Sequence, residues 1–297
     1  MMPRTSVHHD PKQAGQKPPY SSRKQPAPGK EKKMAPQADH GEQSYVGHSR
    51  LTDKVAIITG GDSGIGRAVA IAFAREGADV VLSFLKAEQQ DAQETAHWIE
   101  QAGRRVVLAP GDIQKPKYCQ SLVSMAMRKF DRLDIVVNNA AFQRTHAKPS
   151  DITEKEFDQT FRTNVFGAFY LSQAALESLP KGGSIINTCS IQAFDPSPQL
   201  LAYAATKAAL VSFTKSLAKA VAKQSLRVNG VAPGPVWTPL IPSTMPSKKV
   251  KEFGIDTAFE RAAQPAELAP LYVFLASKEA TYVTGEIYGA TGGQTPY

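Results

Sequence analysis

The chain has 297 residues, a formal net charge of +8 that comes in part from its first segment, and an apolar content that is ordinary for a globular protein. This length allows one large domain or two small ones, and no apolar run is long enough to span a membrane. The two cysteines, Cys119 and Cys189, lie far apart and form no disulfide framework, which fits a reducing, cytoplasmic location.

The first 45 residues differ in composition from the rest. Prolines recur among Lys, Gln, Ser and Gly, and large apolar side chains are nearly absent. Such a segment buries too little surface to offset its chain entropy, so residues 1–45 are predicted to be a disordered leader before a domain at 46–297. A lysine cluster at 30–33 is interrupted by an acid and lacks aromatic neighbours, so neither nucleic acid nor a membrane is expected as a partner. No residues have zinc-like spacing, and no metal is predicted.

The first predicted unit of the domain is a strand, a glycine-rich turn and a helix. The apolar run 54–58 predicts a buried strand, and residues 67–76 have helical apolar spacing. Between them, Gly60, Gly64 and Gly66 follow a Gly-x-x-x-Gly-x-Gly pattern. Such glycines let backbone amides approach a pyrophosphate at a helix N-terminus. The context favours a nucleotide site over a plain turn.

The alternation of strands and helices continues to the end of the chain. Further strands are predicted at 80–84, 105–109, 133–137, 184–187, 226–231 and 286–288, and further helices at 88–101, 117–129, 157–179, 200–222 and 266–275. The helix at 157–179 is expected to be broken near Asn164. This order predicts an α/β fold, a single domain with a doubly wound, mostly parallel seven-stranded sheet of Rossmann type.

Three polar residues near the fifth strand could carry chemistry. Tyr203 and Lys207 lie four apart on a predicted helix and share one face, and Ser190 lies just past a strand end. A lysine ammonium lowers a phenol pKa from its usual value near 10, which makes the phenol a usable general acid/base. Ser190 could hold a carbonyl or alcohol oxygen against that phenol. Because Tyr-x-x-x-Lys pairs are common on ordinary helix surfaces, the pair alone decides nothing.

Taken together, these motifs resemble the short-chain dehydrogenase/reductase family. The matches are Thr59-Gly60-x-x-x-Gly64-x-Gly66, Asn138-Asn139-Ala140-Ala141, Asn164, Ser190 with Tyr203-x-x-x-Lys207, and Pro233-Gly234. The likeness covers about residues 50 to 293, and Ala141 stands where the family's Asn-Asn-Ala-Gly motif has its glycine. The glycine-rich stretch, residues 232–244 and the Pro-rich leader resemble a bacterial branch of general-stress or uncharacterised oxidoreductases.

The resemblance implies an enzyme that transfers a hydride between NAD(P) and a carbonyl/alcohol pair, acting on a small aldehyde, ketone, alcohol or polyol as a homotetramer or homodimer. It implies that Tyr203 is the acid/base, that Lys207 lowers its pKa and holds the nicotinamide ribose, that Ser190 orients the substrate, and that Asn164 supports a water. The cofactor-binding residues that it implies are Gly60, Asp62, Ser63, Gly64, Ile65, Gly66, Phe84, Lys86, Asp112, Ile113, Asn138, Ala140, Tyr203, Lys207, Pro233, Gly234, Val236 and Thr238. Asn164 could instead be a helix N-cap, Asp112 could close a turn, and Asn138 and Asn139 could be turn residues without a ligand.

The choice of cofactor depends on the end of the second strand, where an acid would bind a ribose 2′-OH and reject a 2′-phosphate. No acid follows Phe84, and Lys86 could meet a 2′-phosphate, so NADP is favoured over NAD. Asp62, inside the glycine-rich turn, counts against a phosphate nearby.

Two other functions remain as alternatives. A sugar-nucleotide epimerase can share the Tyr/Lys pair, but the region after Pro233 is short for one. A nucleotide-sensing binding protein could keep the catalytic residues unused. The residues predicted to face the substrate pocket are Phe142, Gln143, Gln192, Phe194, Trp237 and Leu240.

Overall fold

A seven-stranded sheet runs through the middle of the computed structural model, which describes residues 10–294. Its strands are β1 (Val55–Thr59), β2 (Asp79–Phe84), β3 (Val106–Pro110), β4 (Ile135–Asn138), β5 (Ser184–Thr188), β6 (Arg227–Pro233) and β7 (Ile287–Ala290). Their order is β3-β2-β1-β4-β5-β6-β7, and every neighbouring pair is parallel. Most of the strands are buried on both faces, as expected when helices cover both sides of a parallel sheet.

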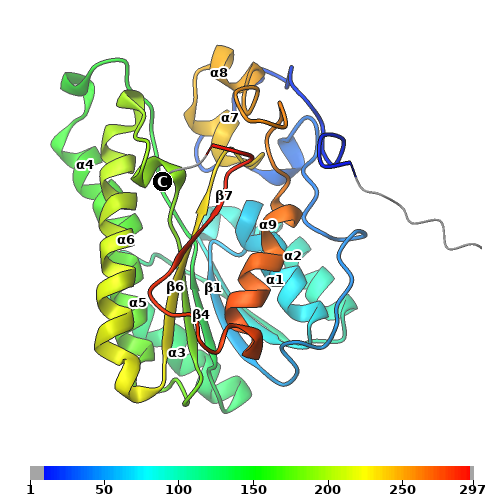
Figure 1. The fold of residues 1–297 in the computed structure, drawn as a ribbon, viewed down its shortest axis with the longest axis vertical. Helices are drawn as coiled ribbons and strands as arrows, with labels where there is room; N and C mark the ends of the chain where they lie inside the picture. The colour runs from blue at the N-terminus through cyan, green and yellow to red at the C-terminus, as the bar shows by residue number, and fades with distance from the viewer. Residues whose placement is uncertain (1–9, 295–297) are drawn as a thin grey trace, which may run out of the picture.

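Helices cover the sheet on both sides (Figure 1). One face carries α1 (Gly64–Arg75), α2 (Gln89–Gln101) and α9 (Pro265–Ala276), and the other carries α3 (Pro116–Phe130), α5 (Gly167–Ala175) and α6 (Leu201–Val221), with α4 (Glu154–Phe161) beside α6. Each face has its own apolar core, with Phe73 and Tyr272 on the first side and Leu122 and Leu171 on the second. The predicted doubly wound α/β fold is therefore confirmed. No helix within residues 10–294 is long and apolar enough to cross a membrane.

The helix expected at 157–179 changes its winding in the middle. It begins at Glu154, where the Thr153 hydroxyl accepts a hydrogen bond from the Glu156 amide, and a π-helical turn at Arg162–Phe166 joins α4 to α5. Asn164 lies inside this turn, at the predicted break. Such turns often mark functional sites because they redirect side chains.

Two short helices after β6 were absent from the sequence prediction. They are α7 (Leu240–Thr244) and α8 (Ser247–Lys251), and they lie beyond the carboxyl ends of the strands (Figure 1). Helices of one turn are too short to show apolar periodicity, which explains why the sequence pattern did not indicate them.

The sheet reverses its winding direction between β1 and β4. The chain builds β1, β2 and β3 outward to one side and then returns to place β4 against the other side of β1. Ligands of open α/β sheets bind at such a reversal, in the crevice outside the carboxyl ends of the strands. The fold therefore places the glycine-rich turn after β1 and the Asn138–Ala141 segment after β4 at one crevice.

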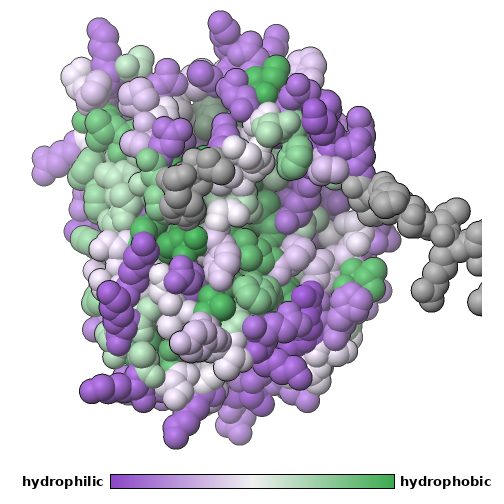
Figure 2. Space-filling view, viewed as in Figure 1, coloured by the Kyte–Doolittle hydropathy of each residue, from purple (hydrophilic) through white to green (hydrophobic). Residues whose placement is uncertain are grey.

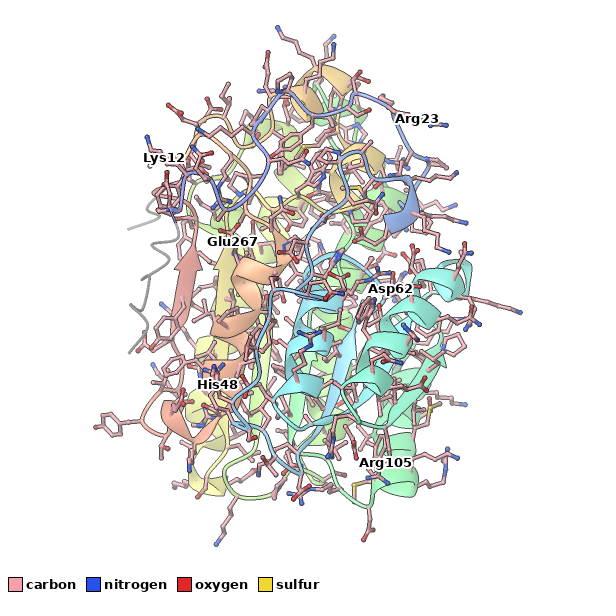
Figure 3. All side chains as sticks on the ribbon, turned by 90° about the vertical axis from the view of Figure 1, so that its right-hand side faces the viewer. Lys12, Arg23, His48, Asp62, Arg105 and Glu267 are labelled. Carbon is pink, nitrogen blue, oxygen red and sulfur yellow. The ribbon has the colours of Figure 1, made fainter. Side chains whose placement is uncertain are left out.

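The expectation of a disordered leader is wrong for residues 10–45. This segment lies across the upper part of the domain, and Figure 3 follows it past Lys12 and Arg23. Tyr20 and Met34 are 3% exposed and belong to a core cluster with Trp237. The composition argument failed because these few apolar side chains join a core that the domain already supplies, and prolines reduce the entropy lost on ordering. Residues 1–9 lie outside the described part of the chain.

We expect Gly66→Ala to unfold the glycine-rich turn. A Cβ at this position would lie 2.0 Å from the Gly60 carbonyl oxygen, in the turn itself, and 2.6 Å from Nδ2 of Asn139, in the segment after β4 that is hydrogen-bonded to the turn. Overpacking of backbone against backbone should cost about 3 kcal/mol or more in the free energy of unfolding, measured by chemical denaturation. The matched control is Gly289→Ala, whose Cβ would meet only a Thr291 methyl at 3.6 Å. Equal stability of the two variants would contradict this account.

Candidate active site

A cavity of about 790 Å³ lies at the carboxyl ends of the strands. Its walls come from the turns that follow β1, β2, β3, β4, β5 and β6 and from α6 and α7. Figure 2 shows a recess in the upper part of the molecule, beside α7 and below α8. This volume suits a ligand of drug or cofactor size.

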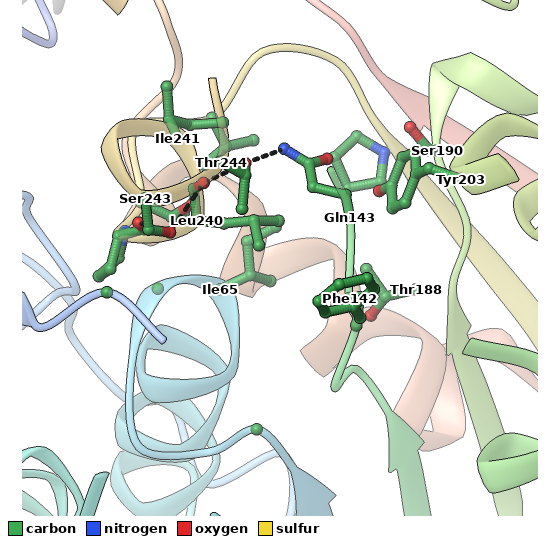
Figure 4. A pocket seen from close by; sticks show the side chains of 18 of the residues that line it. Ile65, Phe142, Gln143, Thr188, Ser190, Tyr203, Leu240, Ile241, Ser243 and Thr244 are labelled. Carbon is green, nitrogen blue, oxygen red and sulfur yellow. Dashed lines mark hydrogen bonds between the residues drawn. The ribbon is translucent and has the colours of Figure 1, made fainter. Parts of the chain in front are cut away.

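Ser190 and Tyr203 meet on one wall of this cavity (Figure 4). Ser190 follows β5, begins a short 3-10 turn and accepts a hydrogen bond from the Gln192 amide at 3.1 Å. Its side chain also faces the Tyr203 phenol and lowers the pKa of that phenol, against the larger effect of burial. Tyr203 lies in the first turn of α6, so the strand end and the helix start bring the two hydroxyls together. An oxygen atom bound between them would meet two hydrogen-bonding groups at once.

Lys207 lies one helical turn after Tyr203 and is buried. Its Nζ donates a 2.6 Å hydrogen bond to the Thr188 carbonyl oxygen and lies 5.4 Å from the centre of the Tyr203 ring. Burial lowers the pKa of Lys207 to about 8 and raises the pKa of Tyr203 to about 12. The expected lowering of the phenol pKa by Lys207 is therefore absent from this state, because desolvation dominates and the group that opposes it is Ser190.

The glycine-rich turn forms the opposite part of the cavity. Gly60 has φ +62° and Gly64 has φ +50°, left-handed values that other residues rarely adopt. Thr59 ties this turn to the β4 segment, because its hydroxyl accepts hydrogen bonds from the amides of Asn139 at 2.9 Å and Ala140 at 3.0 Å. The Asn139 side chain donates in return to the carbonyl oxygens of Thr59 and Gly60. The two turns at the reversal of the sheet thus form one hydrogen-bonded unit.

Two predicted asparagines act inside the protein, outside the cavity wall. The Asn164 amide clamps the Phe142 backbone, accepting from its N–H at 2.7 Å and donating to its carbonyl at 2.9 Å, and also donates to the Thr206 hydroxyl. Asn138 donates to Ser172 and Asn187 and points into the core. Its neighbour Asn139 lines the cavity instead. The alternation of side chains along a strand explains why adjacent asparagines face different surroundings.

The side chains near the end of β2 differ from the expectation that Lys86 meets the cofactor there and that no acid does. Lys86 is exposed and outside the cavity lining, whereas Asp62 and Glu88 line the cavity. Burial raises the pKa of Asp62 to about 6, and burial together with the Asp62 and Asp91 charges raises the pKa of Glu88 to about 8. Oδ2 of Asp62 has no hydrogen-bond partner among the described residues. Glu88 could have been noticed from the sequence as the first acid after β2.

Most of the predicted site residues border the same cavity. Those that line it are Gly60, Asp62, Ser63, Gly64, Ile65, Phe84, Asp112, Ile113, Ala140, Ser190, Tyr203, Lys207, Pro233, Gly234, Val236 and Thr238. Those outside its lining are Gly66, Lys86, Asn138 and Asn164.

The α7 side of the cavity faces Ser190 and Tyr203 across an open space (Figure 4). Gln143 reaches between the two sides and donates a 2.8 Å hydrogen bond to the Thr244 hydroxyl. Of the six residues expected at a substrate pocket, Phe142, Gln143, Gln192 and Leu240 line the cavity. Phe194 packs in a core cluster, and Trp237 is 1% exposed and stacks on Tyr20. Both residues lie outside the cavity lining, because their rings pack against apolar clusters of the protein.

The residues of this cavity fit a dinucleotide. Its lining includes Asp62 and Asp112, the turn at the N-terminus of α1, and Tyr203. The unpartnered Asp62 oxygen can accept a hydrogen bond from a ribose hydroxyl. The amides and dipole of the α1 N-terminus favour a pyrophosphate. Within residues 10–294, no group of three or more potential ligand side chains is arranged to hold a metal ion.

Comparison with known proteins identifies similar chains over almost the whole length. A family model described as enoyl-(acyl carrier protein) reductase matches residues 60–295. An uncharacterised oxidoreductase of Escherichia coli (strain K12), YghA, is 52% identical over 276 residues, which cover 93% of this chain and 94% of that protein. The NADPH-dependent aldehyde reductase 1, chloroplastic, of Arabidopsis thaliana is 42% identical, with 90% and 94% covered. Glucose and ribitol dehydrogenase of Daucus carota is 42% identical, with 94% and 97% covered.

Solved structures agree with these sequence relatives. A short-chain dehydrogenase from Burkholderia cenocepacia J2315 in complex with NADP has a TM-score of 0.77 at 32% identity, covering 82% of this chain and 98% of that chain. A short-chain dehydrogenase from Mycobacterium paratuberculosis bound to NAD has a TM-score of 0.75 at 30% identity, covering 84% and 100%.

Proposed function

Because this chain belongs to the short-chain dehydrogenase/reductase family of NAD(P)-dependent oxidoreductases, we propose that it transfers a hydride between a nicotinamide cofactor and a small carbonyl/alcohol pair, with Tyr203 as the acid/base. The observation that carries the proposal is the meeting of Ser190 and Tyr203 on the wall of a cavity that also contains the glycine-rich turn.

The proposed mechanism divides the work among three side chains. Ser190 holds the substrate oxygen by a hydrogen bond, so that this oxygen faces the Tyr203 hydroxyl. Tyr203 gives its proton to that oxygen in reduction and takes it back in oxidation. Lys207 supplies a nearby positive charge that stabilises the phenolate left behind. A bound nicotinamide supplies the hydride chemistry, and the protein supplies position and protons.

The experiment that tests this function mixes the protein with NADPH or NADH and a panel of aldehydes, ketones and sugars, and follows the absorbance of the reduced cofactor. We expect oxidation of the cofactor with at least one small carbonyl compound. The names of the Arabidopsis and carrot relatives support aldehydes, sugars and polyols as first candidates. Tight cofactor binding without turnover across the panel would favour the nucleotide-sensing alternative.

We propose NADP as the preferred cofactor and NAD as the alternative. The Arabidopsis relative named for NADPH and the Burkholderia complex with NADP support this preference. NAD is favoured by one observation, the two carboxyl groups of Asp62 and Glu88 near the end of β2, where this fold receives the adenosine ribose. A preference for NADP is compatible with these two carboxyl groups if one of them carries a proton at neutral pH.

This idea predicts a pH-dependent cofactor preference. The raised pKa of Glu88, about 8, means that its carboxyl is mostly protonated at pH 7 and can donate a hydrogen bond to a phosphate. As the pH rises through 8, the carboxylate forms and repels a 2′-phosphate. We expect the affinity for NADP to fall about five- to tenfold relative to NAD between pH 7 and pH 9, measured by calorimetry.

Two variants provide the control for this prediction. Glu88→Gln should remove the pH dependence, and Glu100→Gln, at an exposed position near the end of the helix α2 that follows Glu88, should keep it. Parallel pH curves for NADP and NAD in the unmodified protein would show that Glu88 does not discriminate.

We further propose that the protein is a homo-oligomer. Several large apolar side chains on α4, the π-helical turn, α5 and the start of α6 are more than a third exposed, namely Phe157, Phe166, Phe169 and Leu201. Figure 2 shows apolar side chains gathered on this side of the molecule. A gathering of that kind is typical of a subunit interface. Size-exclusion chromatography with light scattering should therefore give a dimer or tetramer, and a monomer at micromolar concentration would contradict the proposal.

A further inference from the structure

Residues 20–40, here called the strap, pack against the domain around Trp237 through aromatic and hydrogen-bond contacts. The Tyr20 ring stacks on Trp237 with centroids 4.2 Å apart and an angle of 13° between the planes. The Trp237 indole N–H donates to the Pro36 carbonyl oxygen at 2.9 Å, and Met34 packs in the same cluster. Trp237 follows β6, so the strap is held by the segment that leads into α7.

The strap also reaches the glycine-rich turn through a buried carboxylate. The Gly64 amide, at the first residue of α1, donates a 2.7 Å hydrogen bond to Oε1 of Glu31. Glu31 is 2% exposed, its own amide donates to Asp91 on α2, and His40 lies 2.9 Å from the same Oε1. Burial alone lowers the pKa of His40, but the carboxylates of Glu31 and Glu42 outweigh it and raise that pKa to about 9. The strap therefore supplies an anion for the α1 N-terminus together with its neutralising cation.

Between these two anchors, the strap becomes part of the cavity itself. Ala27, Pro28 and Gly29 line the same cavity as the glycine-rich turn and Tyr203. Gly29 lies so close to the loop after β6 that a Cβ there would be 2.4 Å from the Pro239 carbonyl oxygen. Glu31 is outside the cavity lining, so its carboxylate supports the turn without occupying the space that a ligand would use.

We propose that the strap is a working part of the dinucleotide site: it closes the gap between the glycine-rich turn and the Pro239 loop, and Glu31 is a positioning residue for the turn. This inference depends on the proposed function, because it requires a dinucleotide in the cavity. Since residues 27–29 form the wall, a bound dinucleotide and the docked strap stabilise each other, and the coupling is reciprocal.

The relatives give separate support to this inference. The likeness to the Escherichia coli oxidoreductase extends over more residues than 46–297 contain, so it reaches into the N-terminal segment. A counterpart of at least part of this segment is therefore present in that protein.

The first test measures the dissociation constant for NADPH by calorimetry in three variants. Glu31→Ala removes the acceptor of the Gly64 amide, and we expect it to raise the dissociation constant about tenfold. Glu31→Gln keeps an acceptor oxygen of the same reach and should restore most of the affinity. Glu100→Ala makes the same truncation at an exposed position of α2 and should change nothing.

The possible outcomes distinguish a failure of this inference from a failure of the proposed function. Unchanged or tighter NADPH binding in Glu31→Ala, with normal binding in the unmodified protein, would overturn the strap's role alone. Failure of the unmodified protein to bind either NADPH or NADH would overturn the proposed function, and this inference with it.

A second test uses the unmodified protein and does not depend on how the variants fold. Arg23 and Lys24 are exposed on the strap, so trypsin should cleave there when the strap undocks. We expect saturating NADPH to slow this cleavage about tenfold, while hydrolysis of a chromogenic peptide in the same tube stays constant. Equal cleavage rates with and without NADPH would refute the coupling.

Discussion

Tyr203→Phe should lower turnover by about 10²- to 10⁴-fold, the range that general acid/base groups contribute. The substitution removes one oxygen atom and keeps the ring that packs at the start of α6. Because the phenol meets Ser190 on the cavity wall, we expect it to serve the reacting oxygen and to contribute little to holding the dinucleotide. Steady-state kinetics and calorimetry with NADPH should therefore give a large loss in kcat with a dissociation constant within about threefold of the unmodified protein.

The matched control for this experiment is Tyr282→Phe. Tyr282 is fully exposed, so removal of its hydroxyl should leave both turnover and cofactor binding unchanged. Turnover of Tyr203→Phe close to that of the unmodified protein would remove Tyr203 from the mechanism.

Lys207→Met should reduce turnover about 100-fold and also weaken cofactor binding about tenfold, because the ammonium serves both the phenol and the proposed ribose contact. Lys207 is 2% exposed, and within residues 10–294 its Nζ donates one hydrogen bond, to the Thr188 carbonyl oxygen, which leaves further donor capacity for a ligand. Methionine keeps the length of the stem and removes the charge. Kinetics and calorimetry measure the two effects separately, and unchanged affinity for NADPH would show that Lys207 does not hold the cofactor.

The same variant has a second, independent signature in stability. Burial depresses the pKa of Lys207 to about 8 from 10.5, so the unfolded chain binds more protons than the native protein between these values. The free energy of unfolding should therefore rise with pH across the window from about 8 to 10.5, as far as Lys207 contributes. Lys207→Met should remove this contribution. Urea denaturation at pH 8 and pH 10 measures it, and an equal slope in both proteins would show that Lys207 is not desolvated.

Much of the fold follows from local sequence patterns. Each strand of the parallel sheet is a short apolar run, and each long helix has apolar spacing of its own, so both are recognisable without tertiary information. The glycine-rich turn and the Tyr203/Lys207 spacing are likewise local features. Their convergence on one cavity follows from the winding rule for parallel sheets, which brings all carboxyl ends to one side.

What could not be predicted depends on contacts between distant segments. Nothing local to Tyr20 or Glu31 indicates that a proline-rich segment finds Trp237 and the Gly64 amide as partners. Which of two adjacent asparagines faces the cavity depends on the register of β4, and the orientation of Lys86 depends on the course of the turn after β2. The pKa of Tyr203 was predicted in the wrong direction because desolvation is a property of the folded surroundings.

The stacking of Tyr20 on Trp237 gives the molecule its own optical probe. The sequence contains two tryptophans, and the other, Trp98, is a partly buried residue of α2 that lies against His97. A change in the fluorescence emission of Trp237 should therefore accompany any movement of the strap away from the domain. Replacing Trp98 with phenylalanine would leave a single emitter, so that the opening and closing of this wall could be followed in real time without an attached dye.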